Sequence, residues 1–357
     1  MKIHLKFISY IFLKSFLFVF FIFFSLVFIL NLLSEIEFFK NISIKSYTIL
    51  YLSLLNSPAL VFEMLPFIFL ISTQVFYIKL LENNEIQIFK YSGLKNSKLI
   101  IITSIITLVL SFFIIIFFYN FSSNLKRIYL EHKNQYTGDG KYLAVITKNG
   151  LWIKDVVDKN INIINATKID KNFLIDTSVS QFDTDYNSIK TLISEKIDIS
   201  KNIWTMFNVK ILSEENTYKQ EQLDFKSNFD YLKIQNLFSD LSSLSLLGLI
   251  ELRNNYTNLN YSTLEVDAHI LKLFSYPFYF VLMTILSTII MLNSKQLKNS
   301  TIKIATGLFL CVIIYYINNL FYIMGTTEKI YLQIAIWTPL LLLFSINVVM
   351  LQNINEK

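Results

Sequence analysis

Six long apolar stretches restrict the folds that this sequence can adopt. Each is about 20 residues long, which at ~1.5 Å of rise per residue lets a helix cross the ~30 Å hydrocarbon core of a bilayer. The stretches are Ile11–Leu33, Ala59–Leu81, Leu99–Phe118, Ile270–Leu292, Ile302–Met324 and Ile330–Leu351. Three precede and three follow a more polar segment, residues 121–269. We therefore predict an α-helical membrane protein with six transmembrane helices, arranged three plus three around an inserted domain.

The charge distribution indicates how such a chain is oriented. The net charge is +6, yet residues 121–269 hold 17 Lys or Arg and 19 Asp or Glu, so the positive excess lies in the membrane half. Most of that excess precedes the first stretch or lies around the loops after the second and fourth: Lys2, Lys6, Lys14, Lys79, Lys90, Lys95, Lys98, Lys295, Lys298 and Lys303. The positive-inside rule then places both termini in the cytoplasm and residues 121–269 outside. Charge spread over short loops does not indicate a nucleic-acid surface, so we expect no nucleic-acid partner.

The outer segment has the pattern of an all-β domain. Lys141–Thr147 and Leu151–Val157 flank Lys148-Asn149-Gly150, and Asn-Gly between two β-prone runs predicts a hairpin. Further β-prone runs follow at Ile161–Ala166, Phe173–Ile175, Thr191–Ile199 and Trp204–Leu212. Short strands separated by turns indicate an antiparallel sandwich or jelly roll. From Tyr231 the apolar spacing becomes helical, which predicts a helical connector through Leu237, Leu241, Leu244 and Leu247–Leu249.

Motifs of the common catalytic sites are missing from the sequence. The only cysteine, Cys311, lies in the fifth apolar stretch, so one chain has no disulfide framework. There is no G-x-x-x-x-G-K-[ST], no G-x-S-x-G and no H-E-x-x-H, and the three histidines are far apart. We expect no cofactor, no metal site, no catalytic residues and no enzymatic activity of the chain alone.

A short amphipathic helix is predicted between the second and third stretches, in residues 82–93. Ile86, Phe89 and Lys90 fall on one helical face, and Gly93 supplies a C-terminal stop. A helix of this kind beside two membrane spans can dock into another protein or lie on the bilayer. The residues alone leave both roles open.

Motifs along nearly the whole chain carry a resemblance to one family. In the loop, Glu85 and Gly93 match the pattern S-E-L-x-x-M-x-A-x-G. The other matching positions are Pro58 and Leu65-Pro66, Asn149-Gly150-Leu151-Trp152-Ile153-Lys154-Asp155, Asn202-Ile203-Trp204, Tyr276-Pro277 and Trp337-Thr338-Pro339. Together they resemble the LptF/LptG permeases, the paired membrane subunits of the lipopolysaccharide-export ABC transporter. The motif around Trp152 and the later Ile203-Trp204 are similar to the G-type subunit rather than the F-type.

The resemblance implies a permease subunit of the bacterial inner membrane that extracts lipopolysaccharide and passes it to a periplasmic bridge. The implied partners are an F-type permease subunit, a cytoplasmic ABC ATPase dimer, the jelly-roll proteins of the bridge and lipopolysaccharide itself. The loop helix becomes the ATPase-coupling helix, with Glu85, Ile86, Phe89 and Gly93 as coupling residues. The implied organisation is transmembrane helices one to three in 1–120 with the coupling helix at 82–93, a periplasmic jelly-roll-like domain with a helical connector in 121–269, and helices four to six in 270–357.

The resemblance also implies a lipid cavity with a lateral gate between the first and fifth helices. Met64, Pro66 and Phe321 would line or border it. G-type subunits carry lysines near the outer end of the first helix, whereas the position in register here is Asn31. We expect the cationic contact with the lipid phosphates to lie further out, at Lys40 and Lys45, or to be shared with Lys126 and Arg127.

Three other functions stay open at the level of the sequence. One is the F-type subunit of the same complex. Another is a six-helix secondary transporter, a class that usually shows inverted repeats and ionisable residues at mid-membrane. The central parts of these spans offer only the uncharged Gln74 and Asn318-Asn319. The third is a membrane-anchored periplasmic sensor or scaffold, for which the short inner loops provide no output domain.

Overall fold

The computed structural model describes residues 3–40, 42, 44–93, 95–137, 151–157, 160–170, 172–184, 186–213, 217–231, 234, 240–258, 262–292 and 300–355. The chain divides into two compact units. The helical unit contains Met1–Lys126 and Leu264–Lys357, and the second unit contains Arg127–Thr263. The sequence predicts domain boundaries after residues 120 and 269. The boundaries between the compact units instead follow Lys126 and Thr263, because both flanking helices extend beyond the apolar stretches.

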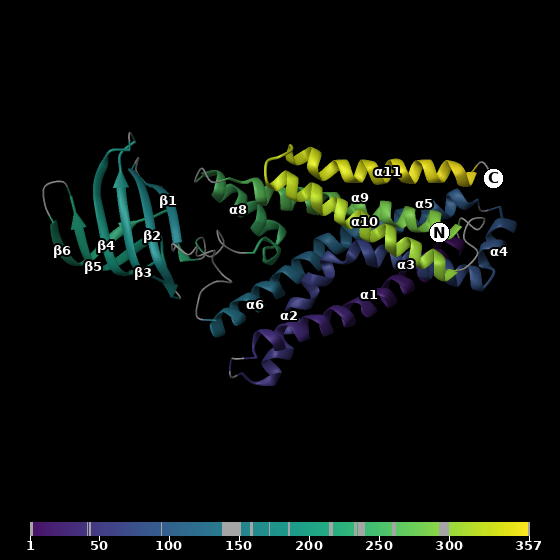
Figure 1. Cartoon of the computed structure of the whole chain (residues 1–357), viewed down its shortest axis with the longest axis horizontal. Coiled ribbons are helices and arrows are strands. Elements are labelled where there is room, and N and C mark those ends of the chain that lie inside the picture. The colour runs from purple at the N-terminus through teal and green to yellow at the C-terminus, as the bar shows by residue number, and fades with distance from the viewer. Residues whose placement is uncertain are drawn as a thin grey trace. The chain divides into compact units, whose positions relative to one another are not determined.

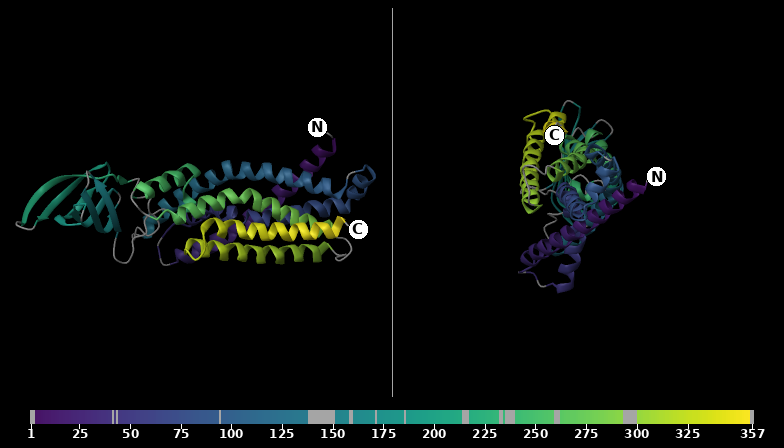
Figure 2. Two further views of the ribbon diagram at one scale, coloured as in Figure 1. Left: turned by 90° about the horizontal axis from the view of Figure 1, so that it is seen from above. Right: turned by 90° about the vertical axis from the view of Figure 1, so that its right-hand side faces the viewer.

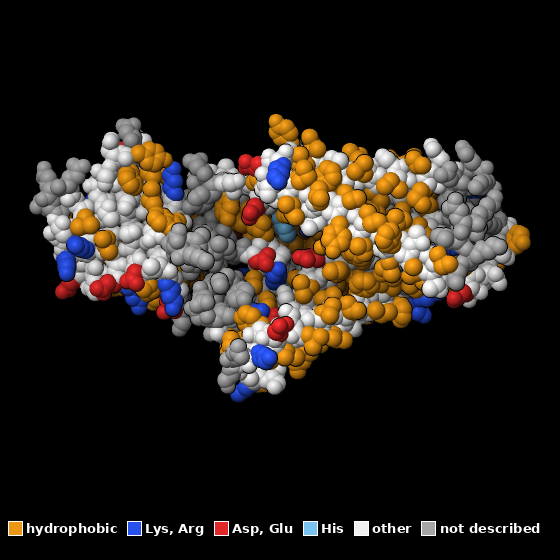
Figure 3. Space-filling model, in the orientation of Figure 1, with side chains coloured by type: hydrophobic (Ala, Val, Ile, Leu, Met, Phe, Trp, Pro, Cys, Tyr) orange, Lys and Arg blue, Asp and Glu red, His pale blue; other side chains and the backbone are white. Residues whose placement is uncertain are grey.

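The helical unit confirms the predicted class of membrane protein. Its elements are α1 (Ile3–Phe38), α2 (Ser46–Glu63), α3 (Leu65–Glu82), α4 (Glu85–Tyr91), α5 (Asn96–Phe113), a π-helix η1 (Ile114–Tyr119), the start of α6 (Asn120–Thr137), α9 (Leu264–Leu292), α10 (Ser300–Thr326) and α11 (Leu332–Asn355). Among the described residues, 6 helices are long and apolar enough to cross a membrane. Hydrophobic side chains cover most of their length on the face in Figure 3, and charged side chains gather toward the ends.

The predicted second span was wrong at its start. The apolar stretch Ala59–Leu81 does not form one helix, because α2 ends at Glu63 and α3 begins at Leu65, with Met64 between them. Pro66 lies in the first turn of α3. Proline lacks a backbone N–H and therefore suits a helix start better than a helix interior. The third span also runs on past Phe118, through η1 and into α6.

Helices α3 and α9 form the centre of the helical unit. In the most apolar segment of each helix, 61% of the residues of α3 and 78% of those of α9 are buried, compared with 11% of those of α10. The central pair stacks Phe69 on Phe280 at 4.8 Å between ring centroids, and Ser287 Oγ donates to Leu70 O at 2.8 Å. Helix α1 packs mainly on α2, α3 and α5, whereas α10 packs on α3, α9 and α11. The outer faces of α1 and α10 are therefore left to lipid or to another subunit.

Both termini lie at one end of the helical unit, close to α4 (Figures 1 and 2). An even number of spans requires this, because each crossing reverses the direction of the chain. The junctions from α1 to α2 and from α10 to α11 lie toward the opposite end.

The second unit contains an antiparallel sheet of 6 strands whose order follows the chain, β1-β2-β3-β4-β5-β6. The strands are β1 (Leu151–Val157), β2 (Asn160–Asp170), β3 (Phe173–Phe182), β4 (Ser188–Asp198), β5 (Ile203–Leu212) and β6 (Thr217–Lys226). The inserted antiparallel β domain is thus confirmed. Its described strands lie in one sheet in meander order, whereas a jelly roll divides its strands between two sheets. The predicted strand Lys141–Thr147, and with it the Asn149-Gly150 turn, lies outside the described residues.

The segment after β6 ties the two edges of the sheet together. Asp155 in β1 is fully buried and accepts hydrogen bonds from Ser227 Oγ at 2.7 Å and from the backbone N–H of Asn228 at 3.1 Å. Trp204 in β5 is also fully buried, and its indole Nε1 donates to the carbonyl oxygen of Phe229 at 2.8 Å. Buried polar groups need hydrogen-bond partners, and these bonds hold the segment after β6 against β1 and β5.

The helical connector predicted from Tyr231 is interrupted before Leu246, and its Leu237 lies outside the described residues. Leu241–Ser243 form one turn of 3-10 helix, and Leu244 is extended, with φ −95° and ψ 137°. Asp240 is the N-cap of this turn, because its side chain accepts a hydrogen bond from the N–H of Ser242 at 2.9 Å. The regular helix α8 begins only at Leu246 and ends at Asn258.

Candidate functional site

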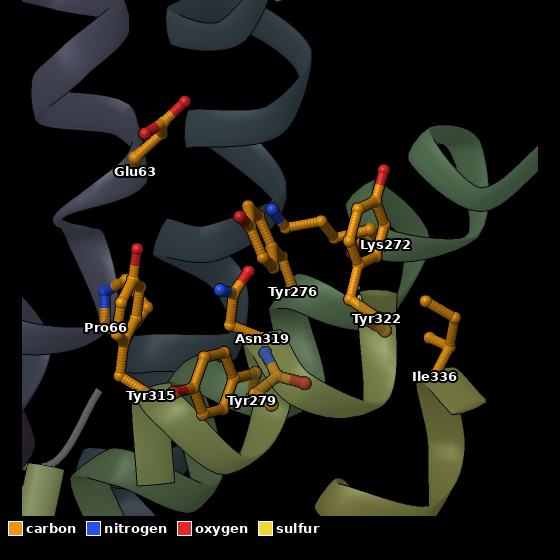
Figure 4. A pocket seen from close by; sticks show the side chains of 11 residues that line it. Glu63, Pro66, Lys272, Tyr276, Tyr279, Tyr315, Asn319, Tyr322 and Ile336 are labelled. Atoms are coloured by element: carbon orange, nitrogen blue, oxygen red, sulfur yellow. Dashed lines mark hydrogen bonds between the residues drawn. The ribbon is translucent and has the colours of Figure 1, made fainter. Parts of the chain in front are cut away.

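A polar pocket of about 250 Å³ lies within the helical unit, where α2 gives way to α3 and where α9, α10 and α11 approach them. Its lining residues are Glu63, Pro66, Lys272, Ser275, Tyr276, Tyr279, Tyr315, Asn318, Asn319, Tyr322 and Ile336. Figure 4 shows these side chains around the pocket, with Glu63 and Pro66 on one side and residues of α9 and α10, such as Lys272 and Tyr322, on the other. Polar groups among apolar spans are costly unless they have a function or a partner, so this pocket is the first candidate for a substrate contact.

Two helices supply most of the lining through the same spacing. Helix α9 contributes Lys272, Ser275, Tyr276 and Tyr279, and α10 contributes Tyr315, Asn318, Asn319 and Tyr322. Both sets stand at positions i, i+3, i+4 and i+7, which lie on one face of a helix. The break at Met64 completes the pocket, because it places Glu63 at the end of α2 and Pro66 at the start of α3.

Lys272 is the cation among the lining residues. Its Nζ lies 4.9 Å from the ring centroid of Tyr322 and 6.0 Å from that of Tyr276. Aromatic faces attract an ammonium group, so the two tyrosines hold the charge at the pocket without neutralising it. Glu63 is the acidic residue of the lining and comes from the opposite wall (Figure 4). A lysine surrounded by tyrosine hydroxyls and asparagine amides can donate several hydrogen bonds to an anion such as a phosphate.

The helix α4 is the second candidate, at the other end of the helical unit. It covers Glu85–Tyr91, and the chain leaves it through Gly93 at φ 81°, as expected of a glycine stop. Ile86 and Phe89 are buried in one apolar cluster with residues of α1, α3, α5 and α9: Ile8, Phe12, Phe76, Tyr77, Leu80, Leu99 and Met291. One short helix is therefore part of a cluster that includes residues of four spans.

The opposite face of α4 is exposed. Ile88 is 58% exposed and Tyr91 is 88% exposed. Glu85 stands in the first turn, and its Oε2 is buried with no hydrogen-bond partner among the described residues. The arrangement is that of a helix fixed to its own bundle on one side and available to another molecule on the other.

Comparison with known families identifies the family of the chain. The sequence matches the family model described as "Lipopolysaccharide export system permease LptF/LptG" over residues 7–353, which include the pocket and α4. The chain belongs to this LptF/LptG family. No curated protein matches the sequence in a direct comparison. As a family member, the chain is a permease subunit for lipopolysaccharide export, a multi-pass protein of the inner membrane and part of a complex with other subunits. LptF/LptG permeases have no ATPase site of their own.

The structure places the residues predicted for the lipid cavity of this LptF/LptG permease near the pocket, with one of them inside it. Pro66 lines the pocket. Met64 forms the break between α2 and α3, and Phe321 precedes the lining residue Tyr322, but neither is among the lining residues.

The four cations predicted to contact lipid phosphates lie outside the pocket lining. Lys40 is exposed after the end of α1, and Lys45 is exposed at the N-cap of α2, with Nζ 5.8 Å from the ring of Tyr47. Lys126 lies at the end of the helical unit. Arg127 begins the second unit and pairs with Glu131 at 4.0 Å.

Sequence reasoning missed Lys272 as a site residue. A signal for it was present, since Lys272, Ser275, Tyr276 and Tyr279 repeat the helical spacing within an otherwise apolar stretch. It also missed Ile88 and Tyr91, because it assigned the partner-facing role to the apolar face of α4. That face is the buried one.

Proposed function

We propose that this chain is the G-type subunit of the lipopolysaccharide-export ABC transporter. It would pair with an F-type subunit, bind a cytoplasmic ABC ATPase dimer through α4 and deliver lipid to periplasmic jelly-roll proteins. The observation that carries the proposal is that α4 has two different faces. Its Ile86 and Phe89 are buried in a cluster with residues of four spans, and its Ile88 and Tyr91 are exposed. A chain without its own ATPase site needs such a helix to receive the work of ATP hydrolysis. The G-type assignment rests on the motifs around Trp152 and Trp204.

The proposed orientation places α4 and both termini in the cytoplasm. The lysine-rich loops supply the argument, through the positive-inside rule. The polar pocket then lies toward the periplasmic side, because α2 and α3 meet at the end of the second span that is remote from α4. Lipopolysaccharide enters from the outer leaflet of the inner membrane, so its phosphates reach the bundle at this level.

The pocket would hold a phosphate of the lipid on Lys272. Phosphate oxygens accept charge-assisted hydrogen bonds from an ammonium group, and these are about twice as strong as neutral ones. Glu63 balances the charge of Lys272 while the pocket is empty, and an entering phosphate would replace it as the partner of the lysine. Removing one acyl chain of about a dozen methylenes into water would cost roughly 10 kcal/mol, at ~0.8 per CH₂. The acyl chains must therefore stay against apolar helix faces while the phosphate is bound.

The lateral gate would be built with the partner subunit. Helix α1 packs on α2, α3 and α5, and α10 packs on α3, α9 and α11, so the first and fifth spans of one chain have different neighbours. A gate between a first and a fifth span would join helices of two subunits. At the β domain, the inner face of the sheet is covered, and β1 and β6 are the edge strands of the described sheet. Strand addition at an edge is therefore the proposed contact with the jelly-roll bridge.

Photo-crosslinking at two neighbouring tyrosines would test this function. Tyr315 lines the pocket, whereas Tyr316 is 67% exposed and is not among the lining residues. Benzoylphenylalanine in place of Tyr315 should capture lipopolysaccharide in the working complex, and capture should fall when ATP drives the lipid onward. The same group at Tyr316 reports the background from bulk lipid or a neighbouring subunit. Equal capture at both positions, with no effect of ATP, would contradict the proposal.

Co-purification followed by mass spectrometry would test the partners. The full chain should carry a second, F-type permease and an ABC ATPase in stoichiometric amounts. Recovery of a second copy of this chain in place of the F-type subunit would refute the pairing.

A further inference from the structure

A second cavity lies at the α4 end of the helical unit and is separate from the pocket around Lys272. Its volume is about 770 Å³, within the ~300–1,000 Å³ that small-molecule sites occupy. Its lining comes from the starts of α1 and α5 and the end of α4: His4, Leu5, Phe7, Ile88, Phe89, Ser92, Gly93, Lys98, Ile101 and Ile102. The proposed transport mechanism uses α4, whose Ile88 lines this cavity, but it assigns no role to the residues of α1 and α5 that form the rest of the lining.

The lining combines an apolar wall with a basic rim. Phe7, Ile101 and Ile102 form a wall on two membrane helices, and the Phe7 ring meets that of Phe89 edge to face at 6.2 Å between centroids. His4 and Lys98 are the basic residues of the lining, and none of the lining residues is acidic. Gly93 leaves open space where a side chain would otherwise stand. The cavity thus offers hydrocarbon contacts on one side and positive charge on the other.

We propose that this cavity binds an anionic phospholipid of the adjacent leaflet, with its phosphate at Lys98 and His4 and its acyl chains along Phe7, Ile101 and Ile102. The charge pattern selects an anion, and the apolar wall on two spans selects a lipid over a free phosphate. Lys98 lies in the first turn of α5, where a lysine can reach the headgroup level of a bilayer. The leaflet follows from the proposed orientation, which makes it the cytoplasmic one.

The lipid would brace the coupling helix from the side that the protein core leaves open. Ile88, Phe89, Ser92 and Gly93 contribute the α4 wall of the cavity, while the buried cluster supports the helix from within. An occupied cavity therefore fixes α4 between α1 and α5. Coupling to the ATPase would then depend on the anionic lipid content of the membrane, which is a property separate from the lipid being transported.

Charge reversal at two lysines of one segment tests the site. Lys98 lines the cavity, and Lys95 is an exposed lysine three positions earlier that does not. The purified permease complex is returned to nanodiscs of phosphatidylcholine with a small fraction of phosphatidylglycerol, extracted, and examined by native mass spectrometry. Lys98→Glu should reduce retained phosphatidylglycerol about tenfold, as loss of one charge-assisted contact predicts, and Lys95→Glu should leave it unchanged.

A photo-crosslinker locates the bound lipid. Ile101 lines the cavity and is 56% exposed, and Ile105, one turn further along α5, is 57% exposed but does not line it. Benzoylphenylalanine at Ile101 should capture phosphatidylglycerol in a manner that Lys98→Glu abolishes, whereas capture at Ile105 should be insensitive to that change. Equal losses with both lysine variants would show a diffuse surface potential and overturn the site. So would crosslinking at Ile101 to an ATPase subunit in place of lipid. Neither readout involves lipopolysaccharide, so failure here is distinct from failure of the transport proposal.

Discussion

A lysine within a membrane helix is tolerated where other groups stabilise its charge. The rings of Tyr276 and Tyr322 stabilise the charge of Lys272 through cation–π contacts. The ring faces attract the charge without accepting strong hydrogen bonds, and the hydroxyl of Tyr276 is a hydrogen-bond partner of the ammonium group. An entering phosphate would therefore compete with Tyr276 and Glu63 for Lys272. The environment of this one residue thus suits temporary binding and release.

Neutralising Lys272 should weaken the retention of lipopolysaccharide. A charge-assisted hydrogen bond contributes ~1.5–3 kcal/mol, so Lys272→Met should reduce lipid retained by the purified complex roughly 10- to 100-fold. Lys272→Arg keeps the charge and should retain most of it. The measurement is quantification of lipid A phosphate in the complex before and after ATP. Equal retention by the Met variant and the unchanged chain would exclude Lys272 as the contact and return attention to Lys40 and Lys45.

The residue scale also shows what the sequence concealed. Lys272 was visible in the sequence, but its importance depends on Tyr322, which lies on another helix and 50 positions away in the chain. Pairings between distant spans are fixed by packing and leave no local pattern. Lys40 and Lys45, by contrast, were chosen because they are outer-loop cations. The structure gives them solvent and the ring of Tyr47 as surroundings.

At the scale of elements, α4 has a buried face, with Ile86 and Phe89, and an exposed face, with Ile88 and Tyr91. Ile88→Ala with Tyr91→Ala should reduce co-purification of the ATPase, because both side chains are exposed and available to a partner. The folded bundle should keep its thermal stability. Phe89→Ala should instead lower the thermal stability of the bundle, because removal of a buried phenylalanine costs about 3–5 kcal/mol of stability. Pull-down yield and melting temperature, measured on the same preparations, separate the two effects. A stable Phe89→Ala variant would contradict the buried position.

A close contact between α3 and α10 gives a second test at this scale. A Cβ at Gly307 would lie 2.1 Å from Nε2 of Gln74, which itself donates to Lys303 O at 3.1 Å. Gly307→Ala should therefore displace the buried Gln74 amide from its hydrogen bond with Lys303 O and lower the melting temperature of the complex. Gln74→Ala in addition should relieve the clash and restore part of the loss, as a non-additive double-mutant cycle. Additive losses in the double variant would show that the two residues do not meet.

The sequence predicts an element when residues within that element determine it, and misses an element that depends on pairing with a distant segment. Strands β1 to β5 contain the predicted runs because apolar and polar residues alternate in them. Strand β6 was missed because Thr217–Lys226 is mostly polar and exposed, and its pairing with β5 alone makes it a strand. The helix α4 was found from its apolar spacing and Gly93. The break at Met64 was missed because the apolar stretch Ala59–Leu81 continues across it, and hydropathy alone does not mark where one helix ends and the next begins.

For the whole molecule, the proposed topology can be tested with the native sequence as background. Cys311 is the single cysteine and is buried, so an impermeant maleimide should leave the unchanged chain unlabelled. Tyr91→Cys should react only in inverted membrane vesicles, and Ile203→Cys, at an exposed position of β5, only in spheroplasts. Labelling of Tyr91→Cys from outside would reverse the orientation and with it the roles of α4 and the β domain.

The length of α1 has a consequence for the first span and its neighbour. Its 36 residues correspond to ~54 Å at ~1.5 Å each, far more than the ~30 Å of hydrocarbon, so part of it stands outside the bilayer at any ordinary tilt. Asn31, near its far end, donates to Ser53 O at 3.0 Å and accepts from Asn56 Nδ2 at 3.1 Å. These two hydrogen bonds join α1 to α2, so the end of α1 that extends beyond the bilayer is supported by a second helix. A lipid that moves along this helix pair would leave its leaflet before it contacts a soluble protein.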